Sequence, residues 1–98
     1  MHDITDFEPL NGQPFILPLS VDQNATLTLK SVQPWGVVGP LQTVPRQPFT
    51  LVFQADHTGH LPQAIYPLNH PTLGQIELFI VPIGPTSDGW MQYQAVFS

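Results

Sequence analysis

The chain has 98 residues, a length that predicts a single domain over residues 1–98 with one small hydrophobic core. Only 9% of the residues are charged, and the formal net charge of -5 sets seven acids against Lys30 and Arg46, too few basic groups to neutralise a row of phosphates. The composition therefore excludes nucleic acid as a partner. With no cysteine and no apolar run of roughly 18 residues, it also excludes disulfides, thiolate metal sites and membrane insertion.

The sparse charge predicts that part of the surface is covered by another protein. Few charges leave apolar patches free to associate, so we expect a homo-oligomer or docking on a tail or fibre protein. The alternative is a monomer solvated by Gln, Thr, Asn and Ser. The first residues, MHDITDFEPLNG, lack the basic and apolar regions of a secretory signal. We expect synthesis in the cytoplasm. This is compatible with later incorporation into an exported or virion-like particle.

The first half of the chain predicts a short helical turn followed by a hairpin. Segment 5–12 has early acids and an Asn-Gly stop, and its turn would lay Phe7 and Leu10 over one end of the core. Alternating apolar residues predict strands at 15–19 and 25–32, joined by a turn at 22–24. Prolines and glycines then predict an irregular stretch over 33–47.

The second half predicts a meander of short strands separated by Pro and Gly. The strands are expected at 49–54, 64–68, 75–83 and 90–97. Segment 75–83 is apolar on both faces, which predicts a central strand buried on both sides. Proline at positions 18, 67 and 82 is expected to block unwanted edge pairing.

Six short strands in so small a chain predict an all-β domain. We expect a small, partly open antiparallel barrel, because closure buries one face of every strand and limits exposed edges. A two-layer β-sandwich is the alternative. No helix of three turns is expected, and no internal repeat is visible.

Three segments carry a resemblance to a known family. They read FTLVFQ at 49–54, LPQAIYPLNHPTLGQIELFIVPIGP at 61–85 and YQAVFS at 93–98. Together they resemble a small bacterial family of similar length, a domain of unknown function found near genes for phage-tail-like fibre and collar proteins. The resemblance covers the second half of the chain and implies a structural or accessory module of a tail-like or fibrous assembly, with no catalytic residues to carry over. Residues before Phe49 depart from the pattern.

The sequence thus predicts a non-enzymatic module of a larger protein assembly. Aromatic residues are enriched at interface hot spots, and together with the apolar residues of the proline-rich stretch they give the expected partner-binding set: Trp35, Val37, Val38, Leu41, Trp90 and Tyr93. The alternative is a small-ligand or carbohydrate-binding domain that stacks sugars on the exposed aromatics of this set. A further alternative for Trp90 and Tyr93 is that they pack on the core or cover a sheet edge.

Neither a metal site nor a catalytic site is predicted. His57, His60 and His70 could converge on Zn²⁺ or Ni²⁺, but turns do not hold imidazoles in fixed register, so we expect solvated turn histidines and no cofactor. Glu77 is the one acid in a long apolar strand. Pointing inward it would be a candidate acid or base, and pointing outward it would face water or pair with Lys30 or Arg46.

Overall fold

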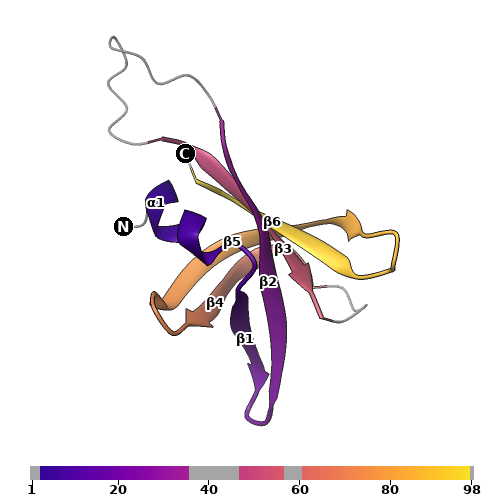
Figure 1. Ribbon diagram of the computed structural model, residues 1–98. Coiled ribbons are helices and arrows are strands. Elements are labelled where there is room, and N and C mark those ends of the chain that lie inside the picture. Colours follow the sequence, from indigo (N-terminus) through magenta and orange to yellow (C-terminus); the bar gives the residue numbers. More distant parts are fainter. Residues whose placement is uncertain (1–2, 36–46, 57–60, 98) are drawn as a thin grey trace, which may run out of the picture.

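Six antiparallel strands form one closed barrel in the computed structural model, which describes residues 3–35, 47–56 and 61–97 (Figure 1). The strands are β1 (Pro14–Ser20), β2 (Gln23–Pro34), β3 (Phe49–Ala55), β4 (Ala64–His70), β5 (Gly74–Pro85) and β6 (Met91–Phe97). Their order around the barrel is β1-β2-β3-β6-β5-β4. The predicted six-stranded antiparallel barrel is confirmed, and the two-layer sandwich does not form.

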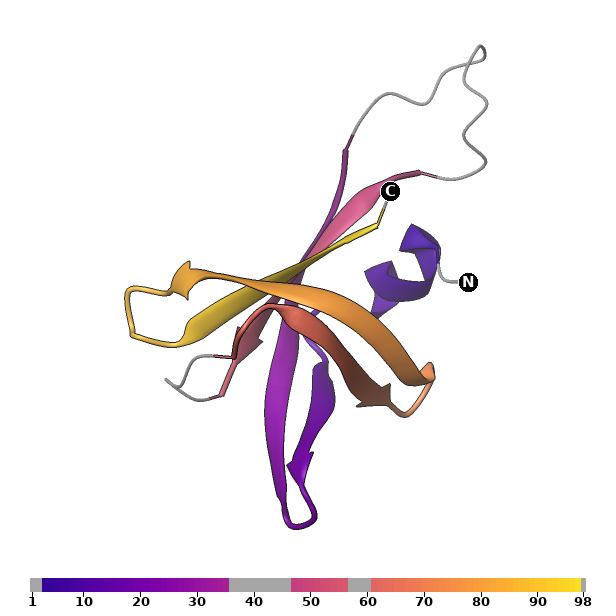
Figure 2. The ribbon, with the colours of Figure 1, turned by 180° about the vertical axis from the view of Figure 1, so that it is seen from behind.

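Alternate residues of every strand point into the barrel and build the core. On β3 the inward positions are Phe49, Leu51, Phe53 and Ala55, all of them buried. The Phe15 and Phe53 rings meet in an edge-to-face contact with centroids 5.4 Å apart, which joins β1 to β3 inside the barrel. The first strand follows its predicted alternation only as far as Leu17, because Leu19 is exposed where the β1–β2 hairpin runs beyond the barrel (Figure 2).

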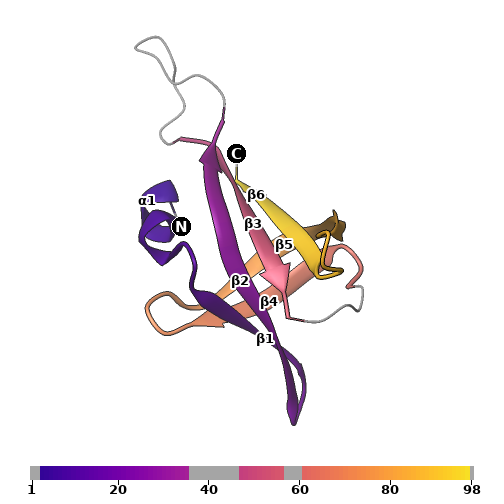
Figure 3. The same cartoon turned by 45° about the vertical axis from the view of Figure 1, so that its right-hand side comes forward.

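A short helical segment covers one end of the barrel. It consists of α1 (Ile4–Phe7) and the 3-10 helix η1 (Glu8–Leu10), and α1 lies beside β2 (Figure 3). The Asp3 N–H donates to the Asp6 carboxylate at 2.8 Å, which satisfies one backbone group at the start of the helix. Phe7 and Leu10 are buried, which confirms that this turn lays both side chains over the core.

The backbone hydrogen bonds of β2 show which neighbour each residue faces. The Leu29 N–H donates to the Gln13 carbonyl at 3.0 Å on the β1 side, whereas the Asp56 N–H, beyond β3, donates to the Thr26 carbonyl at 3.0 Å. Along an antiparallel strand, the N–H and carbonyl groups of successive residues point alternately toward one neighbouring strand and the other. In this part of β2 the backbone groups of odd-numbered residues therefore point toward β1 and those of even-numbered residues toward β3. Ile16 pairs with Thr26, whose backbone groups point away from β1. The backbone groups of Ile16 therefore also point away from β2, toward β4.

Prolines limit the seam that closes the barrel. β1 and β4 pair only at Ile16↔Asn69, and this register sets Pro18 opposite Pro67. Both would face across the seam, yet neither has an N–H to donate. The barrel is closed, and at this seam a single residue pair closes it. As the sequence predicts, these prolines stand where they block edge pairing, and Pro82 likewise faces away from β6 because its neighbour Val81 pairs with Gln94.

Two details of the strands differ from the sequence-based prediction. β5 is not buried on both faces: Ile76, Leu78 and Ile80 are buried, whereas Glu77 and Phe79 between them are exposed. A closed barrel has a single interior, and nothing in the described structure covers its outside. The β2–β3 ladder also continues to Pro34↔Phe49, so the predicted irregular stretch begins later, and residues 36–46 lie outside the described ranges.

Candidate functional site

The outer wall of the barrel carries very little charge. Among the strand residues that the structure describes, Lys30 on β2 and Glu77 on β5 are the only Lys, Arg, Asp or Glu. The remaining acids of the described ranges lie in the N-terminal segment and in turns. Association with another protein through this wall would therefore require the desolvation of few ions.

Two sides of the wall differ in polarity. β2, β3 and β6 turn outward mainly hydroxyl and amide side chains, namely Thr26, Thr28, Thr50, Gln54, Gln92 and Gln94. Some of these are direct cross-strand partners, as in Gln54↔Gln92 and Thr28↔Gln54. The outward positions of β4 and β5 are more apolar.

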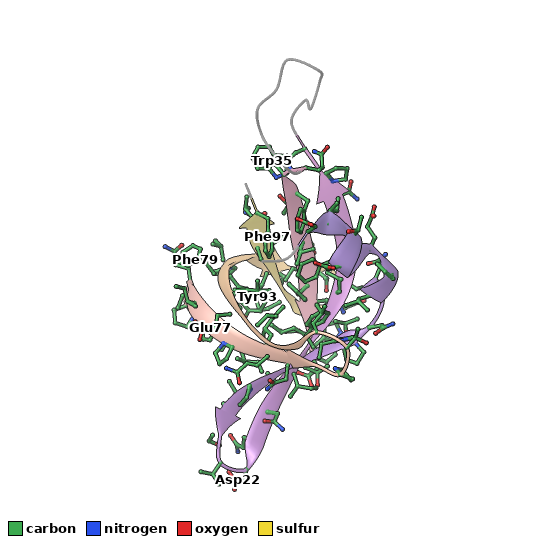
Figure 4. All side chains as sticks on the ribbon, turned by 90° about the vertical axis from the view of Figure 1, so that its left-hand side faces the viewer. Asp22, Trp35, Glu77, Phe79, Tyr93 and Phe97 are labelled. Carbon is green, nitrogen blue, oxygen red and sulfur yellow. The ribbon has the colours of Figure 1, made fainter. Side chains whose placement is uncertain are left out.

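The apolar side of the wall presents a group of exposed large side chains. Ile65 and Phe79 lie directly opposite each other on β4 and β5, and they are 64% and 52% exposed. Phe79 points away from the barrel in Figure 4. The bulged residue Ile83 on β5 and Val96 on β6 are exposed as well. We call Ile65 and Phe79 the outer apolar patch.

Sequence reasoning missed the outer apolar patch. The run QIELFIV has apolar residues on both faces, and this pattern predicts burial on both sides. The same signal describes a barrel strand whose outer face is apolar, because the pattern does not say whether a second layer exists.

Glu77 stands next to the outer apolar patch. It is two residues from Phe79 on the same face of β5, it is exposed, and it points outward (Figure 4). Among the described residues it has no hydrogen-bond or ion-pair partner, and Lys30 lies on β2, which is not a neighbour of β5. The outward orientation removes Glu77 from the candidates for a buried acid or base.

Both tryptophans of the predicted partner-binding set are exposed. Trp35, 42% exposed, follows the end of the β2–β3 ladder, where its backbone N–H donates to the Pro48 carbonyl at 3.0 Å. Trp90, 37% exposed, precedes β6, and its backbone N–H donates to the Thr86 hydroxyl at 3.2 Å. The other predicted residues of the proline-rich stretch lie outside the described ranges: Val37, Val38 and Leu41.

Tyr93 is a core residue and not a surface contact. Its side chain is 0% exposed, and its hydroxyl accepts a hydrogen bond from the Leu61 N–H at 2.9 Å. Burial raises the pKa of the phenol, the Leu61 hydrogen bond opposes this rise, and Tyr66 adds to it. The expectation that Tyr93 contacts a partner is therefore corrected, because β6 alternates and position 93 falls on its inner face.

His70 is also a structural residue. Its Nδ1 accepts a hydrogen bond from the Thr72 N–H at 3.0 Å, and its Nε2 lies 2.7 Å from the Gln13 amide oxygen. Its ring packs against that of Phe15, with the two ring centroids 4.8 Å apart. Both ring nitrogens of His70 are therefore engaged in hydrogen bonds within the fold. His57 and His60 lie outside the described residues, and within the described ranges no group of three or more His, Cys, Asp or Glu is placed to hold a metal ion.

A shallow hollow of about 340 Å³ lies beside the seam. It is lined mainly by apolar atoms, and its walls include Ile16, His70 and Pro71. The only ionisable side chain in this lining is His70, which is already bonded through both nitrogens, so the hollow brings no reactive groups together.

Comparison with known proteins identifies a family. The model of a family described as Domain of unknown function (DUF6916) matches residues 2–97. No curated protein and no solved structure matches the chain. In the part of the chain that the structure describes, no helix has the length and apolar character needed to cross a membrane.

Proposed function

The chain belongs to the DUF6916 family of domains of unknown function, and from the surface of its barrel we propose that it is a non-enzymatic structural or accessory module of a larger protein assembly. The outer apolar patch carries this proposal. Fully burying an Ile or Phe side chain contributes about 1.5 to 3 kcal/mol, so Ile65 and Phe79 together offer a substantial gain to any protein that covers them.

Low charge around the patch supports protein docking over other uses. Interface cores are depleted of charged residues and enriched in aromatic ones. The outer wall has both features on its β4–β5 side, where Glu77 is the single charge beside Phe79. The exposed Trp35 adds an aromatic anchor at the end of the β2–β3 ladder.

Within this proposal the assembly is a tail-like or fibrous particle. The resemblance of residues 49–98 to a family found near genes for phage-tail-like fibre and collar proteins supports that assignment. In such a particle the module would self-associate or dock on a fibre protein, and the outer apolar patch would be its contact surface.

The test is the mass of the full chain in solution, measured by light scattering after size-exclusion chromatography. We expect wild type to exceed the single-chain mass of 10.9 kDa. The double variant Ile65→Thr/Phe79→Thr should have a lower mass and an intact fold, because threonine is well tolerated in strands and both side chains are exposed. Val52→Thr, on the outward face of β3, is the matched control and should leave the mass unchanged.

A second pair of measurements separates docking from sugar binding. Trp35→Ala should weaken association and leave the isolated fold intact, and a glycan array should give no hits. A monomeric wild type that binds glycans and loses them with Trp35→Ala would contradict the proposal and favour the carbohydrate-binding alternative. A wild type whose larger mass survives the double substitution would show that the outer apolar patch is not the contact.

A further inference from the structure

β5 is longer than either ladder in which it takes part. Its first half, from Gly74 to Ile80, pairs with β4. Its second half pairs with β6, and that ladder ends at Val81↔Gln94. Beyond this point β6 continues along β3 to Phe49↔Phe97, so β5 and β6 separate. The first half of β5 therefore has a neighbouring strand on one side only.

The backbone alternation shows which groups line the open side. Asn69 faces β1 across the seam, so the even-numbered residues of β4 face β5 and pair with the even-numbered residues of β5. Gln75, Glu77 and Phe79 accordingly turn their N–H and carbonyl groups away from β4. The strand ladders of the described residues pair these groups with no other strand, and no strand runs along this side of β5 in Figure 2.

This edge differs from the seam and from the second half of β5 in having no proline. Pro18 and Pro67 remove donors from the seam, and Pro82 and Pro85 remove them from the second half of β5. Three alternate residues with intact N–H and carbonyl groups instead remain between Gly74 and Ile80. We call Gln75, Glu77 and Phe79 the open β5 edge.

We propose that the open β5 edge binds an extended segment of a different protein chain by β-strand addition, with a basic residue of that segment opposite Glu77. The inference rests on the proposed function and names its partner surface. In strand addition the main-chain hydrogen bonds supply affinity and alternate side chains supply specificity. The exposed ring of Phe79 would pack on an apolar outward residue of the added strand.

Charge decides between a second copy and a different chain. Two copies pairing antiparallel along all three edge residues would set Glu77 directly opposite Glu77, and like charges in that position are destabilising. A basic residue there instead gives an opposite-charge pair with an exposed carboxylate that has no partner among the described residues. The net charge of -5 favours approach of a basic segment in the same way.

The experiment uses the full chain and two short synthetic peptides of alternating threonine and valine. One peptide has lysine at its centre and the other has glutamate there. In the free protein, the amides of Gln75, Glu77 and Phe79 should exchange with solvent faster than those of Ile76 and Leu78. The lysine peptide should slow exchange at these three amides, and the glutamate peptide should bind about fivefold more weakly.

Three variants locate the interaction. Glu77→Lys should reverse the preference between the two peptides, and Glu77→Gln should abolish the preference without abolishing protection. Glu77→Pro should abolish binding, because it removes an edge donor that the β4–β5 ladder does not use. If the proline variant fails to fold, the charge reversal alone decides.

The possible failures are distinct. If the lysine peptide does not bind, or protects other amides, while wild type still exceeds its single-chain mass and loses that mass with Ile65→Thr/Phe79→Thr, strand addition is wrong and the proposed function stands. A monomer that binds neither peptide contradicts both. Equal binding of the two peptides to wild type would show that the added strand does not need a basic residue opposite Glu77, and this part of the proposal would be wrong.

Discussion

At the scale of single residues, the interior of the barrel explains why several polar side chains are structural. Tyr93 and His70 both point inward from strands, and each meets a backbone group that completes its hydrogen bonding. Buried polar groups are tolerated only with such partners. The polar atoms of both side chains therefore form hydrogen bonds within the fold.

The raised pKa of Tyr93 predicts a loss of stability in alkali. The unfolded phenol ionises near pH 10, whereas burial keeps the folded phenol neutral to higher pH. Above about pH 10 the unfolded state therefore binds fewer protons than the folded state, and the free energy of unfolding falls as pH rises. Urea denaturation of wild type at neutral and alkaline pH should show this decrease.

Tyr93→Phe is the matched variant for this prediction. It should cost about 1 kcal/mol at neutral pH, because the half-buried Leu61 N–H loses its acceptor. Its free energy of unfolding should then depend less on alkaline pH than that of wild type. An equally steep decrease in the variant would assign the alkaline effect to other groups.

At the scale of elements, the N-terminal helical segment is held by an aromatic cluster. Phe49 and Phe97 are cross-strand partners whose rings stack with centroids 4.5 Å apart, and Phe7 lies against both at 5.7 and 5.4 Å. The helix is too short to be stable by itself. Its position therefore depends on this contact.

Phe7→Ala should consequently destabilise the whole domain. Removing a buried Phe side chain costs about 3 to 5 kcal/mol, because both transfer free energy and packing are lost. Thr5→Ala, at an exposed position of the same helix, is the control and should change stability by less than about 0.5 kcal/mol. Chemical denaturation measures both. Equal stability of the two variants would mean that the helix does not contribute to the core.

The elements themselves could be predicted from the sequence, whereas the functional surface could not. Alternation such as that of Phe49, Leu51 and Phe53 depends on local spacing, and the strand it predicts is confirmed. Whether Phe79 lies under a second layer or faces outward depends on how distant strands close, which local spacing does not contain. The sequence leaves Tyr93 between a partner contact and the core for a similar reason, since an aromatic residue after a turn suits either face.

At the scale of the whole molecule, the edges of the barrel are not alike. The seam between β1 and β4 is short and has prolines on both sides, whereas the open β5 edge has none. This distribution matches the general use of proline to protect strand edges from unwanted pairing. It leaves the open β5 edge available for strand addition, beside an exposed phenylalanine.

The seam offers the last prediction. Pro18 and Pro67 would face each other across it, so replacing both with threonine supplies an N–H on each strand and should add a second pair beside Ile16↔Asn69. Slower amide hydrogen exchange at Ile16 and Asn69 is expected in the double variant. Neither single substitution should reach that protection, because each leaves one strand without a donor. Pro34→Thr is the control, since Pro34 faces away from β3 and should leave exchange at the seam unchanged. Unchanged exchange in the double variant would mean that the divergence of β1 from β4, and not the prolines, limits closure.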